Sequence, residues 1–365
     1  MKTKVAIIFG GKSAEHEVSL NSATNIYNAI DKTKYDVVLL GNDKNGAWHF
    51  NSNYDKDEVD LTINNYFLHS QKVFIEIVEN KISIIDKHSN KTLENFDVAF
   101  PITHGTYGED GTLQGFLKFL NIPFVGPDVL GSAICMDKDV TKRLLRDNNI
   151  PIANFISIYK SQQNELSFEQ ARKKLGMPMF IKPCNAGSSV GVNKVTDESS
   201  FKTALNQAFK YDNKILIEEA IIGKEVECAV LGNENPKASI IGEIIPTKDF
   251  YSYDAKYKHT DGAKMKIPAE IPDDVSDKLQ ETAIKAFNVT CCVGMARVDF
   301  FLKENNEFVV NEINTLPGFT EISMYPKLWE QTGISYPDLI SKLIELSIER
   351  HKRNNELIRH TTAGL

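Results

Sequence analysis

The stretch RVDFFLKENNEFVVNEINTLPG, residues 297–318, has the pattern of a β-hairpin that runs into a tight loop. Apolar and polar residues alternate through residues 297–303 and again through residues 308–313, and a polar, Asn-rich segment at 304–307 separates the two runs. Alternation on both sides of such a turn is typical of two antiparallel strands. The loop at residues 314–318 leaves the second strand, and its backbone N–H groups can face a developing negative charge.

Four polar side chains of this hairpin are predicted to lie together. Residues two apart in a strand share a face, so Arg297 and Asp299 point the same way. With the turn centred on residues 305–306, Asp299 lies opposite Glu312 and Arg297 lies opposite Asn314. Facing carboxylates repel unless a cation lies between them, and oxygen ligands favour a hard cation such as Mg²⁺. A solvated polar sheet face explains the same residues, and the hairpin alone leaves both interpretations open.

The composition is that of an ordinary globular chain. Its 365 residues are enough for two or three domains, with 42% hydrophobic and 25% charged residues. The net charge of −7 argues against a nucleic-acid-binding protein, whose surface would be basic. No apolar run is long enough for a transmembrane helix, and the short one near the start fits a first β-strand better than a signal peptide. Five cysteines without C-x-x-C spacing indicate buried, reduced thiols. We therefore expect a cytoplasmic protein with no membrane or nucleic-acid partner.

The N-terminal part has the element order of a Rossmann-like unit. Residues 4–9 are a continuous apolar run, as in a buried parallel strand, and a helical pattern over residues 19–30 leads to a second strand at 35–40. Units of this kind bind ligands at the carboxyl ends of their strands. Short antiparallel strands are expected within residues 41–95, to which we assign no function. A Gly-rich loop at residues 103–111 then follows another buried strand.

The rest of the sequence predicts two further units that mix helices and strands. We expect domains at residues 1–129, 130–217 and 218–365. Residues 250–268 are too many and too polar for a buried element, so we expect a mobile functional loop there. The other expected helices cover residues 112–120, 129–148, 168–175, 199–209, 275–287 and 335–353, and the other expected strands cover residues 72–78, 81–86, 97–101, 179–183, 214–218, 225–231 and 238–245.

Two lysines and a small-residue loop indicate a phosphate site. Lys138 and Lys182 are compact charges that suit phosphate oxygens, although a single lysine is more often a solvated surface charge. The loop GSSVG at residues 187–191 can wrap a phosphate through its N–H groups, or it can be a simple hairpin turn. Taken with the acids and the asparagine of the hairpin, these residues favour a nucleotide held between two domains.

Seven motifs in this chain resemble those of the ATP-grasp superfamily and, within it, of the D-alanine–D-alanine ligase family. They are GGKSAEHEVSLNSA (residues 10–23), HGTYGEDGTLQG (104–115), MDK (136–138), IKPCNAGSSVGV (181–192), YDAKY (253–257), GMARVDFFL (294–302) and NEINTLPGFT (311–320). They occur in family order over nearly the whole chain. The resemblance implies an α/β fold, α+β overall, in which a Rossmann-like N-terminal domain precedes a two-domain ATP-grasp unit. It also implies ATP-dependent joining of two D-alanines to D-alanyl-D-alanine, through a D-alanyl phosphate, for the synthesis of cell-wall peptidoglycan.

The resemblance also implies roles for individual residues. ATP would be bound by Lys138, Lys182, Ser188, Ser189, Glu218, Glu219, Ile221, Glu225 and Lys256, and two Mg²⁺ or Mn²⁺ ions by Asp299, Glu312 and Asn314. Glu15, with His104 nearby, would bind the ammonium of the first D-alanine, and Glu15, Ser188 and Tyr257 would form a triad that closes the mobile loop. Arg297 and the N–H of Gly318 would form an oxyanion hole, and Ser323 and Met324 would lie beside the carboxylate of the second amino acid. Taken alone, Glu15 is explained as well by an acid near the start of a helix.

Three alternatives stay open at this stage. Relatives of the vancomycin-resistance type join D-alanine to D-lactate or D-serine, whereas Tyr257 matches the form that uses D-alanine. A nucleotide-binding protein without activity would have lost part of the implied site, which is intact here. Other carboxylate–amine ligases of the superfamily, as in glutathione or biotin metabolism, give no account of Glu15 and His104. The resemblance also implies a homodimer.

Overall fold

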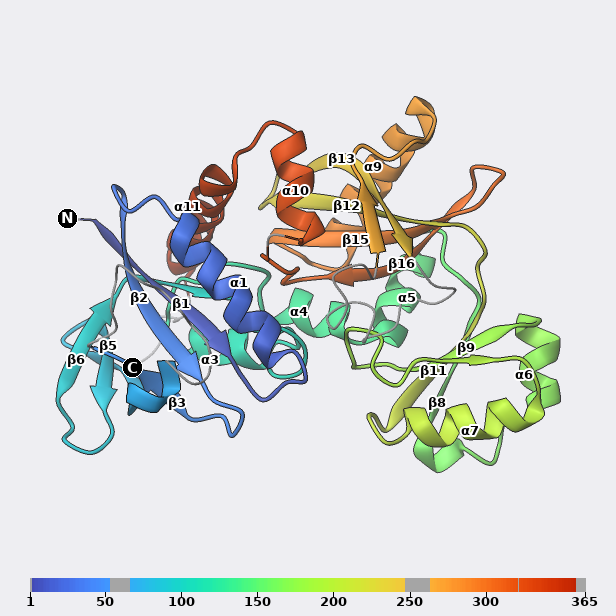
Figure 1. Ribbon diagram of the computed structural model, residues 1–365, viewed down its shortest axis with the longest axis horizontal. Helices are drawn as coiled ribbons and strands as arrows, with labels where there is room; N and C mark the ends of the chain where they lie inside the picture. The colour runs from blue at the N-terminus through green and yellow to red at the C-terminus, as the bar shows by residue number, and fades with distance from the viewer. Residues whose placement is uncertain (1, 53–65, 247–262, 321, 359–365) are drawn as a thin grey trace.

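The computed structural model describes residues 2–52, 66–246, 263–320 and 322–358, in which the strands form three sheets. Figure 1 shows the N-terminal sheet at the left, a small sheet at the lower right, and a third sheet above and between them. Helices pack on all three sheets. The predicted mixed α/β class is therefore confirmed. No helix in the described part of the chain is long and apolar enough to cross a membrane.

The N-terminal sheet combines a parallel and an antiparallel part in the strand order β6-β5-β4-β3-β2-β1-β7. Strands β1 (Thr3–Gly10), β2 (Tyr35–Asn42) and β7 (Val98–Pro101) are parallel, and β3 (Trp48–Phe50), β4 (Gln71–Val78), β5 (Lys81–Asp86) and β6 (Thr92–Phe96) extend the sheet in antiparallel fashion. Helix α1 (His16–Ala29) packs on β1 and starts three residues earlier than predicted, and α3 (Thr112–Phe119) follows β7. The parallel strands end at the loops that contain Glu15 and His104, as the Rossmann-like pattern predicts.

The small sheet has four antiparallel strands in the order β10-β9-β11-β8. They are β8 (Phe155–Tyr159), β9 (Met179–Pro183), β10 (Asn193–Val195) and β11 (Lys214–Glu219), and their partner helices are α6 (Phe168–Leu175) and α7 (Glu198–Ala208). Apolar residues of both helices and of the strands form one core cluster, which includes Phe201, Ile181 and Ile217. The opposite side of this sheet carries Lys182 and Glu218, whose side chains point away from this core and pair with each other.

The third sheet contains the hairpin predicted from residues 297–318, in the strand order β14-β13-β12-β15-β16. Its strands are β12 (Lys224–Gly232), β13 (Lys237–Pro246), β14 (Ala263–Lys266), β15 (Gly294–Leu302) and β16 (Phe308–Asn314). Helix α9 (Asp273–Val289) packs on one face, while α10 (Met324–Gln331) packs on the other and leads to α11 (Tyr336–Asn355). Alternation along β12 sends Val226 and Cys228 toward α9 and leaves Glu225 and Glu227 on the opposite face.

One predicted helix and one burial prediction were wrong, and a predicted loop is a strand over four of its residues. Residues 129–148 form two helices, α4 (Val129–Met136) and α5 (Lys138–Asp147), because Asp137 is extended (φ −86°, ψ 99°) and its side chain caps α5 by accepting two backbone N–H groups. Within the loop expected over residues 250–268, residues 263–266 form β14, which pairs with β13 at the sheet edge, and residues 250–262 lie outside the described residues. All five cysteines are free thiols as predicted, but Cys291 is exposed.

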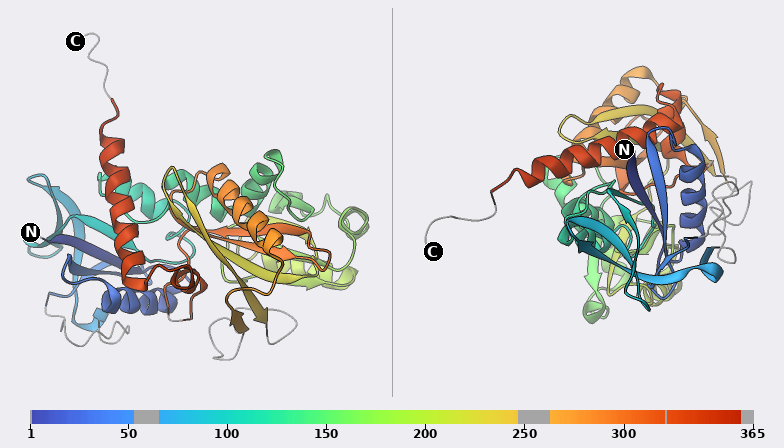
Figure 2. Two further views of the ribbon diagram at one scale, coloured as in Figure 1. Left: turned by 90° about the horizontal axis from the view of Figure 1, so that it is seen from above. Right: turned by 90° about the vertical axis from the view of Figure 1, so that its left-hand side faces the viewer.

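The C-terminal helix α11 returns to the N-terminal unit, as Figure 2 shows from two sides. Arg350 of α11 is buried, and its guanidinium donates to the carbonyl of Phe124 at 2.7 Å and to that of Gly126 at 2.5 Å. It also lies 4.8 Å from the centre of the Phe124 ring. One side chain therefore joins the last helix to the segment that completes the N-terminal sheet.

We expect Arg350→Ala to lower the free energy of unfolding by roughly 2–3 kcal/mol, because two buried carbonyls lose their donors. Arg353 is the matched control, since it lies one turn later on α11, is 40% exposed and pairs with Glu234. Thermal and denaturant unfolding of both variants measure the difference. Equal stability of the two variants would show that Arg350 does not join the two parts.

Candidate active site

Three carboxylates and a guanidinium lie together on one face of the third sheet. In the register of β15 with β16, Asp299 faces Glu312 and Arg297 faces Asn314, so the predicted pairing is confirmed. On the other side of β15, Glu227 of β12 faces Asp299. Directly opposite residues in an antiparallel sheet are close neighbours. The three acids therefore form a row across three strands.

Arg297 is held by two of these carboxylates. Its Nε and Nη2 atoms donate to the two oxygens of Asp299, both at 2.7 Å, and Nε also lies 2.8 Å from Oε2 of Glu227. The Nδ2 atom of Asn314 donates to Oδ2 of Asp299 at 2.8 Å. Burial opposes the charge of a guanidinium, but Asp299 and Glu227 outweigh it and raise the pKa of Arg297 far above its ordinary value. Arg297 therefore stays a cation in this buried position.

The oxygen atoms of Asp299, Glu312 and Asn314 are the donor types that Mg²⁺ and Mn²⁺ prefer. Within the described ranges, no group of three or more His, Cys, Asp or Glu side chains lies close enough to hold a metal without other ligands. Mg²⁺ commonly completes its coordination with water and substrate phosphates. The donor set thus fits a metal ion that binds together with a nucleotide. To serve as a ligand, Asp299 must loosen its contacts with Arg297.

Both predicted phosphate lysines lie beside acids of the site. Lys138 is the first residue of α5; its Nζ donates to the carbonyl of Ala186 at 2.7 Å and lies 3.5 Å from Oε2 of Glu312. Lys182 lies in β9, and its Nζ is 2.7 Å from Oε2 of Glu218. Burial would lower the pKa of Lys182, but the charge of Glu218 outweighs it and the pKa is raised. Lys182 therefore stays a cation, and Lys138 contacts the start of the small-residue loop through Ala186.

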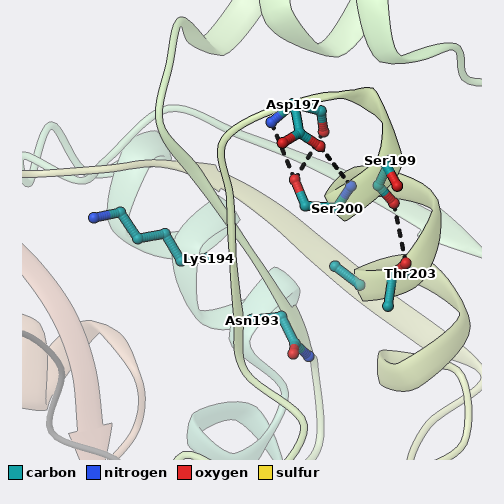
Figure 3. A pocket seen from close by; sticks show the side chains of 7 residues that line it. Asn193, Lys194, Asp197, Ser199, Ser200 and Thr203 are labelled. Carbon is teal, nitrogen blue, oxygen red and sulfur yellow. Dashed lines mark hydrogen bonds between the residues drawn. The ribbon is translucent and has the colours of Figure 1, made fainter.

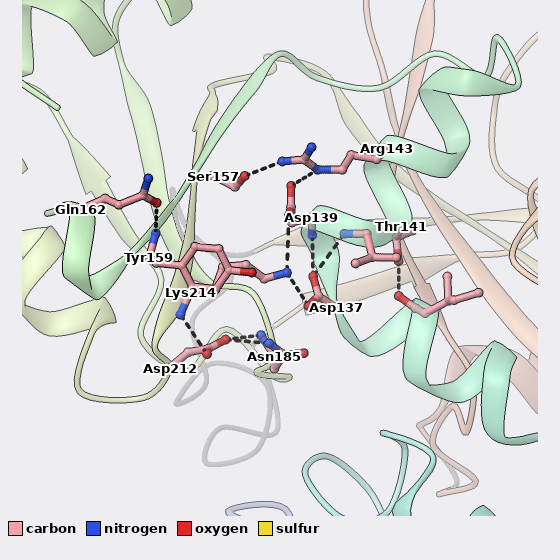
Figure 4. A network of polar contacts seen from close by, with 12 residues as sticks. Asp137, Asp139, Thr141, Arg143, Ser157, Tyr159, Gln162, Asn185, Asp212 and Lys214 are labelled. Carbon is pink, nitrogen blue, oxygen red and sulfur yellow. Dashed lines mark hydrogen bonds and ion pairs between the residues drawn. The ribbon is translucent and has the colours of Figure 1, made fainter. Parts of the chain in front are cut away.

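A polar network fixes the start of α5 to the small sheet (Figure 4). Lys214 of β11 pairs with Asp137, the N-cap of α5, at 2.6 Å. Two residues earlier, the Asp212 carboxylate accepts the N–H of Asn185 at 2.7 Å. Asn185 is the start of the loop that contains the GSSVG sequence. The short segment from Asp212 to Lys214 therefore places Lys138 and this loop relative to each other.

Glu218 is buried between two lysines. Its Oε1 forms a close ion pair with Lys142, and its Oε2 pairs with Lys182. Burial would raise the pKa of Glu218, but the two lysines outweigh it and lower the pKa. Lys142 itself is 1% exposed, and burial lowers its pKa. The sequence reasoning missed Lys142, although it lies four residues after Lys138 and hence on the same helix face.

The other described residues that the resemblance assigns to ATP have different surroundings. Glu219 ends β11, and its carboxylate accepts the N–H of Asn154 at 2.7 Å, which fixes the segment before β8. Ile221 is half-buried in the connection to β12. Glu225 lies on the same face of β12 as Glu227.

Glu15 joins the N-terminal unit to the small-residue loop at residues 187–191. Ser188 donates a short hydrogen bond to Oε1 of Glu15. Positive φ angles at Ser188 (50°) and Ser189 (59°) turn the loop toward this carboxylate. A Cβ atom on Gly105 would lie 2.8 Å from Oε2 of Glu15, and one on Gly187 would lie 3.1 Å from it. Glycine is therefore needed at Gly105, where φ is 74°, and a larger residue at Gly187 would press on Glu15.

His104 joins the same unit to the loop after β16. Its Nδ1 lies 3.0 Å from the carbonyl of Leu316, so this nitrogen carries the proton and donates. Its Nε2 accepts from the hydroxyl of Ser22 at 3.2 Å, and that hydroxyl also accepts the N–H of Phe319 at 3.4 Å. Burial lowers the pKa of His104, which agrees with a neutral ring. The Leu316 carbonyl thus fixes the tautomer, and Ser22, which no sequence pattern singles out, satisfies the other ring nitrogen.

Glu109 forms a second connection to that loop. Its Oε2 accepts the N–H of Gly105 at 2.8 Å, and its Oε1 accepts the N–H of Leu316 at 3.3 Å. Burial, together with the charge of Glu15, raises the pKa of Glu109 to about 8, against an ordinary value of 4.5. The Gly-rich loop is evident in the sequence, but no pattern there singles out Glu109. In the structure, Glu109 connects this loop with the loop after β16.

The loop after β16 brings Gly318 against the start of α10. A Cβ atom on Gly318 would lie 2.7 Å from Oγ of Ser323, which accepts the N–H of Thr320 at 2.9 Å. Ser323 precedes α10, and Met324 is its first residue. The side chain of Met324 is 3% exposed and packs in the hydrophobic core. Met324 can therefore meet a substrate only through its backbone N–H.

Two predicted site residues, Lys256 and Tyr257, lie outside the described residues, as does most of the predicted mobile loop. Glu227 is the remaining residue that the sequence analysis missed. It alternates with Glu225 in a strand, so the two-residue period would have placed it on the same face.

A surface hollow of about 370 Å³ lies between β10 and α7 (Figure 3). Its labelled lining residues are Asn193, Lys194, Asp197, Ser199, Ser200 and Thr203. The Asp197 side chain caps α7 by accepting the N–H of Ser200 at 2.8 Å. This hollow contains none of the predicted site residues, and we do not include it in the candidate site.

The fold and the site together define an ATP-grasp enzyme: a small sheet with lysines and a Gly-Ser loop faces a second sheet with an acidic hairpin. Family models of the D-ala D-ala ligase N-terminus and C-terminus match residues 4–127 and 144–345. The chain therefore belongs to the D-alanine–D-alanine ligase family.

Individual relatives agree with this assignment. A D-alanine–D-alanine ligase of Oceanobacillus iheyensis is 54% identical over 359 residues, which is 98% of each chain. The structure of the D-alanine–D-alanine ligase from Coxiella burnetii superposes with a TM-score of 0.88 at 37% identity, over 98% of this chain and 97% of that one. The VanG D-Ala:D-Ser ligase of Enterococcus faecalis gives a TM-score of 0.85 at 34% identity, over 95% of this chain and 100% of that one.

The raised pKa of Glu109 predicts a pH dependence of stability. Between pH 4.5 and 8 the folded protein holds a proton that the unfolded chain has released, so stability falls as pH rises through this window. In Glu109→Gln this contribution is absent. We expect the free energy of unfolding of the wild-type protein to fall relative to that of the variant from pH 5 to pH 8, by at most about 1.4 kcal/mol per pH unit. The melting temperature of the wild-type protein should fall in the same direction.

Thermal unfolding across this pH range measures the effect. Glu304→Gln, in the exposed turn of the hairpin, is the control and should follow the wild-type curve. A constant offset between Glu109→Gln and wild type at all pH values would contradict the raised pKa.

Proposed function

We propose that this protein joins two D-alanines to D-alanyl-D-alanine at the expense of ATP, as a step of peptidoglycan synthesis. Family membership over almost the whole chain supports this, because relatives at 54% identity carry that activity in their names. The geometric observation that carries the proposal is the Glu15–Ser188 hydrogen bond. It places an acid suited to an ammonium group directly beside a loop suited to phosphate.

This proximity suits the chemistry of the reaction. A carboxylate is a poor acyl donor, because its oxygen is a poor leaving group. Transfer of a phosphoryl group from ATP gives an acyl phosphate, which the amine of a second amino acid can attack with release of phosphate. Glu15 would bind the ammonium of the first D-alanine, with His104 fixing the loops around it. The carboxylate of this D-alanine would then point toward the phosphates of ATP.

The phosphates of ATP would be bound by the positive side of the small sheet. Lys138 and Lys182 supply the charges, and Ser188 and Ser189 supply hydroxyl and backbone donors. Lys256 would contact the transferred group. Glu218, Glu219, Ile221 and Glu225 would border the adenine and ribose; the carboxylate of Glu219 is already bound to Asn154, so its contribution would come from the backbone.

The hairpin would hold two Mg²⁺ or Mn²⁺ ions through Asp299, Glu312 and Asn314. Such ions would supply positive charge against the negative charge that develops during phosphoryl transfer. Lys138 lies 3.5 Å from Glu312, so the metal ligands and the phosphate lysines already meet.

The same hairpin and the loop after it would stabilise the tetrahedral intermediate. Arg297 and the N–H of Gly318 would donate to its oxyanion, and one such donor is worth roughly 3–4 kcal/mol. The hydroxyl of Ser323 and the N–H of Met324 would lie beside the carboxylate of the second amino acid. Acyl phosphates react with water, so the triad of Glu15, Ser188 and Tyr257 would close the mobile loop over the site.

The second substrate is D-alanine in this proposal. The D-Ala:D-Ser ligase is a more distant relative, at 34% identity, than the D-alanine–D-alanine ligases at 54%. Joining to D-lactate or D-serine is therefore not favoured. We further propose a cytoplasmic homodimer without nucleic-acid or membrane partners. The dimer rests on the family resemblance, and light scattering of the purified protein would test it.

We expect ATP hydrolysis to ADP and phosphate to require D-alanine alone, with D-alanyl-D-alanine as the product. Phosphate release, with products identified by mass spectrometry, would be measured with D-alanine, D-serine, D-lactate and other amino acids. Product from D-alanine plus D-lactate, but none from D-alanine alone, would contradict the proposal. Release without any amino acid acceptor would point to a different enzyme of the superfamily.

Replacing Glu312 by glutamine should lower turnover by roughly a thousandfold or more, because a metal ligand loses its charge. Glu307→Gln is the matched control: it lies in the same hairpin, is 67% exposed and pairs with Lys303. Its turnover should equal that of the wild type. Unchanged turnover in Glu312→Gln would rule out the metal assignment.

A further inference from the structure

We propose that Glu227 is a positioning residue that keeps Arg297 in place when Asp299 turns to a metal ion. This inference rests on the proposed function, in which Asp299 is a metal ligand and Arg297 an oxyanion donor. It goes further because it assigns a role to a carboxylate of β12 that neither the sequence motifs nor the proposed chemistry uses.

The Nε atom of Arg297 lies close to two carboxylate oxygens. Its single N–H donates to Oδ1 of Asp299 at 2.7 Å. Oε2 of Glu227 lies 2.8 Å from the same nitrogen and forms an ion pair with the guanidinium. A second bond from Nη2 to Oδ2 favours Asp299 in the present arrangement. Glu227 is therefore in contact with a donor that Asp299 also uses.

A metal ion at Asp299 would compete with Arg297 for this carboxylate. Oδ1 of Asp299 accepts one hydrogen bond from Arg297, and Oδ2 accepts one from Arg297 and one from Asn314. A metal ion bound to Asp299 would place a second positive charge beside the guanidinium and draw electron density from the same oxygens. The bonds between Arg297 and Asp299 would then weaken.

Glu227 is placed to take over without a change in the fold. It lies directly opposite Asp299 in the register of β12 with β15, so its backbone is fixed by the sheet. Its side chain is 13% exposed and that of Arg297 is 18% exposed, so neither group has free access to water. When Oδ1 of Asp299 leaves, the Nε–H can turn fully to Glu227, and the buried cation keeps a charged acceptor.

The same contact would fix the direction of Arg297 during catalysis. With Nε held by Glu227, the two terminal nitrogens are the donors left for the developing oxyanion. A largely desolvated charge that loses its partner is costly. Without Glu227, the metal and the guanidinium would compete for Asp299, and metal binding would weaken.

The test is a double-mutant cycle read out by metal binding. Electron paramagnetic resonance would measure the dissociation constant of Mn²⁺ in the presence of ADP for wild type, Glu227→Gln, Arg297→Met and the double variant. We expect Glu227→Gln to raise this constant about tenfold in the wild-type background. In the Arg297→Met background it should change by less than about twofold, because there is no guanidinium left to hold.

A direct effect of the charge of Glu227 on the metal would give the opposite result. The tenfold change would then persist in the Arg297→Met background, and the inference would be overturned. Glu227→Asp adds an independent comparison, since it keeps the charge but moves the carboxylate away from Nε. A positioning role predicts weaker Mn²⁺ binding in Glu227→Asp, whereas a pure charge effect predicts binding equal to that of the wild type.

Two further variants separate this inference from the proposed function. Glu243→Gln removes an equally buried carboxylate on the opposite face of the same sheet, where it pairs with Lys224, and should leave Mn²⁺ binding unchanged. Asp299→Asn tests the metal site itself. If Asp299→Asn leaves Mn²⁺ binding unchanged, the metal assignment fails. If Asp299→Asn weakens Mn²⁺ binding but the effects of Glu227→Gln and Arg297→Met are additive, only the role of Glu227 fails.

Discussion

The site depends on one guanidinium that separates carboxylates which would otherwise repel one another. Glu227, Asp299 and Glu312 face each other across three adjacent strands, at the spacing where like charges destabilise a sheet. Arg297 compensates two of them through short contacts. This arrangement allows acids to lie side by side in an antiparallel sheet.

A second constraint is that three separate units must meet around a small space. Ser188 of the small sheet bonds Glu15 of the N-terminal unit, and His104 bonds the loop that follows the hairpin. Each of these contacts joins segments far apart in the sequence. The polar contacts of Lys214 and Asp212 place the small-residue loop against α5 in the same way. The units are therefore held at their polar edges, next to the site that they form.

Local periodicity made much of the fold predictable. The hairpin follows from a two-residue period and a turn, which are properties of the chain itself. The β-bulge between Asp299 and Phe300, which shifts the register nearer the turn, has no such signal. The break at Asp137 has none either, since the flanking residues all fit a helix and only the cap contacts end it. The edge strand β14 has only four residues, too few for its alternation to stand out from the polar segment before it.

The sequence by itself determined the family, the class of fold, and the residues that could bind phosphate, metal and ammonium, because each motif is a local arrangement of side chains. The tertiary structure alone decided which charges meet. Lys142 pairs with Glu218, the carbonyl of Leu316 sets the tautomer of His104, and Glu227 forms an ion pair with Arg297. The physical reason is that desolvation and pairing depend on distances between separate elements, which no local pattern contains.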